Sequence, residues 1–137
     1  MPVAASIRGS AAILSLPVLV VDDHRTMRAV IAARLRQIGF QDIDTIDDPV
    51  SALTMLGQKR YGVILSDWNM APMDGLAFLR AVRQAPETRT VPFIMVTAEA
   101  RPENIMAAKR LGVDGYIAKP FDTALLKSRL AAVLGPF

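Results

Sequence analysis

Four apolar runs of the sequence end in residues whose side chains can bind a phosphoryl group or a metal ion. Asp22 and Asp23 follow the first of these runs, Asp67 the second, Thr97 the third and Lys119 the fourth. A single aspartate at the end of a strand is most often a turn residue. Five such residues instead predict one shared site, because the carboxyl ends of parallel strands meet at one edge of a sheet.

The three aspartates would repel one another at that edge. Two carboxylates about 4 Å apart near a protein surface repel by roughly 4 kcal/mol. Lys119 can offset part of this repulsion and a divalent cation the rest; oxygen ligands with retained waters favour Mg²⁺ as the cofactor. His24 has no second histidine or cysteine to help it bind a transition metal, so we expect it to be exposed at the start of a helix.

A carboxylate beside Mg²⁺, with an ammonium and a hydroxyl in reach, can attack a phosphorus centre and become an aspartyl phosphate. Lys119 would neutralise the phosphoryl oxygens, and Thr97 would donate a hydrogen bond to one of them. The sequence has neither a G-x-x-x-x-G-K-[ST] loop nor a G-x-G-x-x-G loop after a strand, so we expect no bound nucleotide. The phosphoryl group would come from another protein or from a small acyl phosphate.

The elements that position these residues alternate along the chain. Five short runs have the length and near-continuous apolarity of strands that are buried on both faces, which favours a parallel central sheet. They are residues 18–21, 43–46, 61–65, 91–96 and 115–118. Helical patterns follow each run, with Asp48, Asp74 and Asp122 as expected N-caps and Pro49 and Pro102 as expected first residues. The pattern predicts an α/β fold with helices on both faces of the sheet.

Composition limits the classes of protein that remain. The 137 residues suit one domain, which we place at residues 16–137 after a flexible tail at residues 1–15. The net charge is +3, but the basic residues are scattered, so we expect no nucleic-acid partner. No apolar run is long enough to span a bilayer, and the lack of cysteine suits a cytoplasmic protein.

Five motifs in order resemble the response-regulator receiver family, and most of all its chemotaxis members. They are VVDD at 20–23, SDWNM at 66–70, MDG at 73–75, VTAEA at 96–100 and GYIAKPF at 115–121. The resemblance spans residues 17–134. It implies a doubly wound, flavodoxin-like fold whose five parallel strands lie in the order 2-1-3-4-5.

The resemblance also implies a role for each site residue. Asp67 would be the phosphoacceptor, and Lys119 and Thr97 would contact the phosphoryl group. Direct Mg²⁺ ligands would be the Asp23 and Asp67 carboxylates and the Asn69 carbonyl, with Asp22 reaching the metal through water. The peptide bond before Pro120 would be cis. Where the family usually has proline directly after methionine, this chain has Ala71 and then Pro72, which leaves the path of that loop open.

Two further pairs concern the lifetime and the output of the phosphorylated state. Asn69 and Glu99 each lie two residues beyond a site residue and would face the hydrolytic water of a self-dephosphorylating receiver. Thr97 and Tyr116 would form the switch.

The resemblance also implies the partners. A histidine kinase or phosphotransfer protein would act upstream, on a monomer of this chain. A downstream protein, such as a flagellar-motor switch, would bind the exposed face formed by the fourth helix, fifth strand and fifth helix. The residues expected there are Ala100, Arg101, Ile105, Tyr116 and Arg129.

Two other readings remain open. A Mg²⁺ phosphohydrolase of the haloacid dehalogenase type also forms an aspartyl phosphate, but it needs a second aspartate where this chain has Asn69, so we expect no enzyme of that class. The receiver could also serve as a phosphate sink for a kinase, or as a regulator outside chemotaxis. The sequence does not separate these two roles from motor binding.

Overall fold

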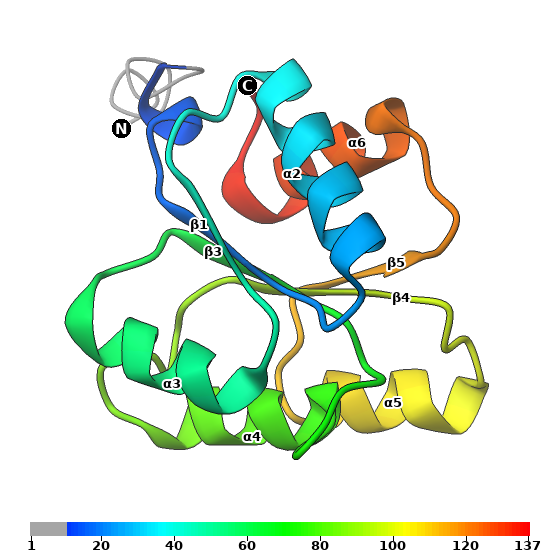
Figure 1. Ribbon diagram of the computed structural model, residues 1–137. Helices are drawn as coiled ribbons and strands as arrows, with labels where there is room; N and C mark the ends of the chain where they lie inside the picture. Colours follow the sequence, from blue (N-terminus) through cyan, green and yellow to red (C-terminus); the bar gives the residue numbers. More distant parts are fainter. Residues whose placement is uncertain (1–10) are drawn as a thin grey trace.

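A parallel five-stranded sheet forms the centre of the molecule in a computed structural model that describes residues 11–137 (Figure 1). The strands lie in the order β2-β1-β3-β4-β5, as the resemblance implied. The strands are β1 (Val18–Val21), β2 (Ile43–Ile46), β3 (Val63–Ser66), β4 (Phe93–Thr97) and β5 (Gly115–Ala118). The helices are α2 (Arg25–Ile38), α3 (Pro49–Gln58), α4 (Gly75–Gln84), α5 (Pro102–Arg110) and α6 (Thr123–Leu134).

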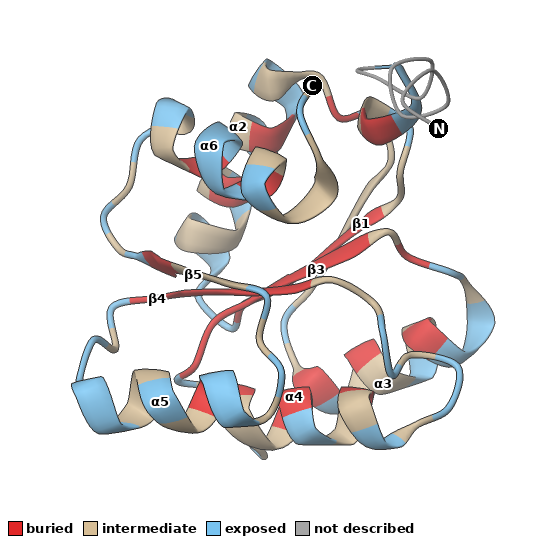
Figure 2. Ribbon diagram, turned by 180° about the vertical axis from the view of Figure 1, so that it is seen from behind, coloured by how far each residue is buried: buried red, intermediate tan, exposed pale blue. Residues whose placement is uncertain are grey.

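Helices cover both faces of the sheet, with α2 and α6 on one side and α3, α4 and α5 on the other (Figure 1). The side chains of a strand alternate between these two layers. In β1, Val18 and Val20 join the core under α2 and α6, whereas Leu19 and Val21 join the core on the opposite face. All four are fully buried, and Figure 2 shows the central strands as the most buried part of the fold. Burial on both faces explains why the strand reads as a continuous apolar run.

Side-chain caps begin three of the helices, as the sequence predicts. Asp48, Asp74 and Asp122 accept hydrogen bonds of 2.8, 2.9 and 2.8 Å from backbone N–H groups three residues ahead. Such bonds satisfy amide groups that the first helical turn leaves without a partner. The helices that lead away from the carboxyl ends of β2, β3 and β5 are therefore fixed at their first turn.

Two strands begin later than their apolar runs indicate. Gly62 N–H donates to the Pro17 carbonyl before β3 starts, and the Val91 N–H donates to the Thr88 carbonyl in a turn after α4. Pro92, directly before β4, has no N–H with which to extend the sheet. The runs at 61–65 and 91–96 thus include two turn residues each, and the strands begin at Val63 and Phe93.

The packed part of the chain extends further toward the N-terminus than residue 16. Residues 1–10 of the expected tail lie outside the described residues. Residues 11–14 form a helical turn, and Ile13 is buried in the core under α2 and α6. Apolar contact therefore holds this segment against the domain, in place of the flexible tail expected there. Within residues 11–137, no helix is long and apolar enough to cross a membrane.

Candidate functional site

The site lies beyond the carboxyl ends of β1, β3, β4 and β5, where strand order reverses between β1 and β3. Backbone hydrogen bonds continue past the strand ends and fix the residues that follow them. The Asp67 N–H donates to the Val21 carbonyl at 3.0 Å, and the Lys119 N–H donates to the Thr97 carbonyl at 2.9 Å. The polar residues are thus held by the sheet itself and not by free loops.

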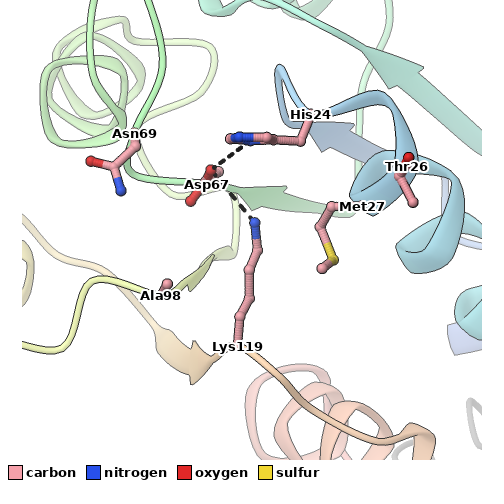
Figure 3. Close-up of a pocket in the computed structure, with 7 residues that line it drawn as sticks. All are labelled: His24, Thr26, Met27, Asp67, Asn69, Ala98 and Lys119. Carbon is pink, nitrogen blue, oxygen red and sulfur yellow. Dashed lines mark ion pairs between the residues drawn. The ribbon is translucent and has the colours of Figure 1, made fainter.

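Lys119 joins two buried carboxylates. Its ammonium Nζ lies 2.9 Å from Oδ2 of Asp22. It lies 3.5 Å from Oδ2 of Asp67, as Figure 3 shows for this second pair. Asp22 is fully buried and the Asp67 side chain is 4% exposed. The other oxygen of Asp67, Oδ1, accepts a hydrogen bond of 2.7 Å from the Trp68 N–H. The contacts of Asp67 therefore differ between its two oxygens, and Oδ2 is the one beside the lysine.

Three carboxylates and one imidazole form a cluster that could hold a divalent cation. One ligand atom each of Asp22, Asp23, His24 and Asp67 lies within 4.8 Å of the others. Both oxygens of Asp22 already accept hydrogen bonds, Oδ1 from the backbone N–H of His24 and Oδ2 from the Lys119 ammonium. Asp23 and Asp67 are the more available donors, which fits the direct and water-mediated roles that the resemblance implied. The donor set is mainly hard oxygen, as Mg²⁺ prefers.

A cleft of about 350 Å³ opens over this cluster. The residues that line it are His24, Thr26, Met27, Asp67, Asn69, Ala98 and Lys119. Thr97 is fully buried at the end of β4, next to the lining residue Ala98. The structure thus brings together Asp22, Asp23, Asp67, Asn69 and Lys119, and Thr97 adjoins them through the hydrogen bond from the Lys119 N–H to its carbonyl.

Every polar group of Glu99 takes part in a hydrogen bond. Its N–H donates to Oγ1 of Thr97 at 3.1 Å, and its carbonyl accepts a hydrogen bond of 2.7 Å from the hydroxyl of Tyr116. Arg101 donates three bonds to its carboxylate, from the backbone N–H at 2.9 Å, Nε at 3.0 Å and Nη2 at 3.1 Å. The carboxylate turns toward α5 in this arrangement, so its predicted contact with a hydrolytic water stays a prediction.

The same contacts perturb two pKa values. Hydrogen bonds from the Arg101 side chain, then from the Arg101 N–H and Asn104, lower the pKa of Glu99 to about 2. Burial, followed by the negative charges of Glu99 and Asp67, raises the pKa of Tyr116 to about 12. Tyr116 is therefore a neutral hydrogen-bond donor near neutral pH, and Glu99 is an ionised acceptor.

The five residues expected at a docking face lie on α5, β5 and α6 or directly before α5, and their role in docking stays a prediction. Ala100, Arg101 and Arg129 are exposed, and Ile105 and Tyr116 are half-buried. Tyr116 connects this face to the site through Glu99. The chain therefore has a continuous set of contacts from Thr97 to the surface.

The sequence did not indicate what His24 and Gly75 do at this site. His24 is 67% exposed, as expected, but its Nδ1 lies 3.1 Å from Asp23 Oδ1, 3.4 Å from Asp22 Oδ1 and 3.9 Å from Asp67 Oδ2. A Cβ on Gly75 would overlap the Asp67 carbonyl oxygen and lie 2.8 Å from the Trp68 Cα. Only its place in the MDG motif marked Gly75. The peptide bond before Pro120 is cis, as expected, and so is the bond between Ala71 and Pro72.

Comparison with known proteins agrees with this geometry. The family model for the response regulator receiver domain matches residues 18–131. Chemotaxis protein CheY-3 of Vibrio cholerae is 40% identical over 116 residues, which are 85% of this chain and 89% of that protein. The structure of Vibrio cholerae CheY4 aligns with a TM-score of 0.82 at 34% identity, over 88% of this chain and 99% of that one. A second similar structure is the receiver domain of a Pseudomonas aeruginosa sensor histidine kinase, which has a magnesium ion coordinated in its active site cleft. It aligns with a TM-score of 0.80 at 30% identity, over 88% of this chain and 98% of that one. This chain belongs to the response regulator receiver domain family of two-component systems, and it is CheY-like.

Proposed function

We propose that this receiver accepts a phosphoryl group on Asp67 from a histidine kinase or phosphotransfer protein of a chemotaxis pathway. The observation that carries the proposal is the placement of Asp67 Oδ2, which lies at the cleft, 3.5 Å from the Lys119 ammonium. A nucleophilic carboxylate needs access to the donor, and the developing charge needs a cation nearby. Asp22 is also near Lys119, but it is fully buried and both its oxygens are occupied.

In the transfer step, Asp67 Oδ2 forms a bond to the phosphorus of a phosphohistidine. The phosphorus–nitrogen bond breaks, and its electron pair stays on the imidazole, which takes up a proton from solvent. Lys119 neutralises charge on the phosphoryl oxygens throughout. Hydrolysis of the aspartyl phosphate ends the signal. A water molecule attacks the phosphorus, the bond to Asp67 breaks, and inorganic phosphate and the free carboxylate result. The chain is thus a phosphoacceptor that loses its own phosphoryl group, and we assign it no external phosphoester substrate.

Mg²⁺ is the cofactor that the donor set supports. The Asp23 and Asp67 carboxylates and the Asn69 carbonyl would hold it, with Asp22 in support. When bound, the ion would supply positive charge to the phosphoryl oxygens. The magnesium ion in the Pseudomonas aeruginosa receiver domain supports this assignment.

Phosphorylation would act on a partner through Thr97, Glu99 and Tyr116. The Thr97 oxygen accepts the Glu99 N–H, so the hydroxyl hydrogen of Thr97 is free to donate to a phosphoryl oxygen. Turning that hydroxyl alters the support of Glu99, whose carbonyl holds Tyr116. A downstream protein, such as a flagellar-motor switch, would then bind the face that Tyr116 and Arg101 share. The similarity to a chemotaxis protein supports a role in chemotaxis.

Trp68 reports directly on this proposal. It is the chain's one tryptophan, it is 7% exposed, and its backbone N–H donates to Asp67 Oδ1. Adding acetyl phosphate with Mg²⁺, or beryllofluoride with Mg²⁺, should therefore change its fluorescence. The Asp67→Asn variant keeps the Oδ1 acceptor and should give no change. An equal response in the variant, or none in the native chain, would remove Asp67 as the acceptor.

A further inference from the structure

His24 occupies the N-cap position of α2 without acting as a cap. Its backbone is extended, and within residues 11–137 its side chain makes no capping hydrogen bond. Residues with a short side-chain oxygen are preferred at this position because they bind the free amides of the first turn. The imidazole instead points toward Asp67 (Figure 3), and its Nδ1 also lies near the carboxylates of Asp22 and Asp23. This side chain therefore contributes to the cluster and not to the start of the helix.

The spacing of the imidazole and the carboxylates matches that of metal ligands. Ligands about 2.1 Å from an ion, at right angles to each other, lie roughly 3 Å apart, and opposite ligands lie roughly 4.2 Å apart. Nδ1 of His24 lies 3.1 Å from Asp23 Oδ1, near the first value, and 3.9 Å from Asp67 Oδ2, between the two. One ion could therefore contact Nδ1 and both oxygens after small side-chain movements.

We propose that His24 is a nitrogen ligand of the divalent cation at this site, and that it gives the site a preference for Co²⁺-like transition metals over Mg²⁺. The inference rests on the proposed metal site and adds a ligand to it. It replaces the expectation that a lone histidine would not bind a transition metal, because neighbouring carboxylates supply the other ligand atoms. Imidazole binds late first-row divalent ions well, whereas Mg²⁺ favours oxygen donors. Replacing one water of a Mg²⁺-type oxygen set by imidazole therefore raises transition-metal affinity far more than Mg²⁺ affinity.

The composition of the chain makes the inference easy to test. The sequence has one histidine and no cysteine, so any imidazole nitrogen on the metal must come from His24. Untagged protein, native and His24→Phe, would be titrated with Co²⁺ and with Mg²⁺ at one mildly alkaline pH. The Phe variant keeps a planar ring of similar size but has no nitrogen. Thr26→Ala is the matched control, since Thr26 lines the same cleft from the first turn of α2 and has no imidazole.

His24→Phe should weaken Co²⁺ binding about tenfold or more and change Mg²⁺ binding less than about twofold. Thr26→Ala should leave the ratio of the two affinities unchanged. Proton NMR of the Co²⁺-loaded native chain should show strongly shifted ring resonances of a single histidine, and these should be missing from His24→Phe. An equal effect on both metals, no effect on either, or unshifted histidine resonances would overturn the role of His24.

The response of Trp68 to acetyl phosphate with Mg²⁺ separates this inference from the proposed function. If native protein and His24→Phe both respond but their Co²⁺ preference is the same, His24 is not a ligand and the receiver function stands. If the native chain binds Co²⁺ through His24 but never responds to acetyl phosphate, the metal ligand stands and the phosphoacceptor function fails.

Discussion

The Lys119 ammonium and the fully buried Asp22 carboxylate lie 2.9 Å apart, although 97 positions separate them in the sequence. The same ammonium also pairs with Asp67. The negative charge of Asp22, Asp23 and Asp67 together therefore exceeds the single positive charge of Lys119. We therefore expect net repulsion among these carboxylates in the metal-free chain, which a divalent cation would relieve.

Asp67→Asn should accordingly stabilise the metal-free protein. The substitution removes repulsion from two carboxylates at the loss of one contact with Lys119, and we expect the free energy of unfolding in EDTA to rise by about 1 kcal/mol or more. Mg²⁺ should stabilise the native chain by mass action and the variant far less. Urea unfolding with and without Mg²⁺ measures both effects. A variant less stable than the native chain in EDTA would show that repulsion does not dominate at this site.

Gly75 brings the start of α4 against the backbone of Asp67, with its N–H donating to the Trp68 carbonyl at 2.7 Å. Gly75→Ala places a Cβ into that backbone and should cost roughly 1–3 kcal/mol of stability, together with slower phosphorylation. Gly57→Ala is the matched control, because Gly57 is an exposed residue of helix α3 and has nothing within 4 Å of the added Cβ. This control should gain roughly 0.5–1 kcal/mol from helix propensity. Equal effects of the two substitutions in urea unfolding would contradict the close approach at Gly75.

Much of this site is visible in the sequence because the sheet determines it. Polar residues that follow apolar runs identify Asp22, Asp67 and Lys119, since the carboxyl ends of parallel strands meet at one edge of the sheet. The sequence does not predict that the His24 side chain points toward the aspartates or that the Glu99 side chain points toward Arg101. The direction of a side chain in a loop depends on neighbours that only the folded chain supplies. The same holds for the fold: the N-terminal segment that contains Ile13 has no strong helical period, and its packing is a tertiary effect.

The Glu99 carboxylate and Arg101 should control the lifetime of the aspartyl phosphate in opposite directions. If Asn69 and Glu99 orient the hydrolytic water, replacing both with alanine should lengthen the lifetime several-fold. Arg101→Ala should release the Glu99 carboxylate and shorten it. The decay of radiolabel from phosphorylated protein measures each variant. An effect of Arg101→Ala that persists unchanged in the Glu99→Ala background would show that Arg101 does not act through Glu99.

The Glu99 carboxylate should also make stability depend on pH in acid. Its pKa is about 2 in the folded chain against an ordinary 4.5, so below pH 4.5 the unfolded chain binds the proton first. The stabilising contribution is therefore complete above pH 4.5 and is lost as the pH falls toward 2. Arg101→Met should return the pKa of Glu99 toward its ordinary value, as followed by NMR of the side-chain carboxyl carbon. A Glu99 carboxyl in the native chain that titrates near 4.5 would contradict the contact with Arg101 in solution.

Chemical mapping of the phosphorylated position tests the assignment of Asp67 most directly. Protein treated with acetyl phosphate and Mg²⁺ would be reduced with borohydride, which converts an aspartyl phosphate into homoserine, and then digested for peptide mass spectrometry. We predict homoserine at position 67 and an unmodified aspartate at positions 22, 23 and 74. Homoserine at one of those other aspartates, or phosphoryl uptake that leaves Asp67 unreduced, would contradict the assignment of Asp67 as the phosphoacceptor.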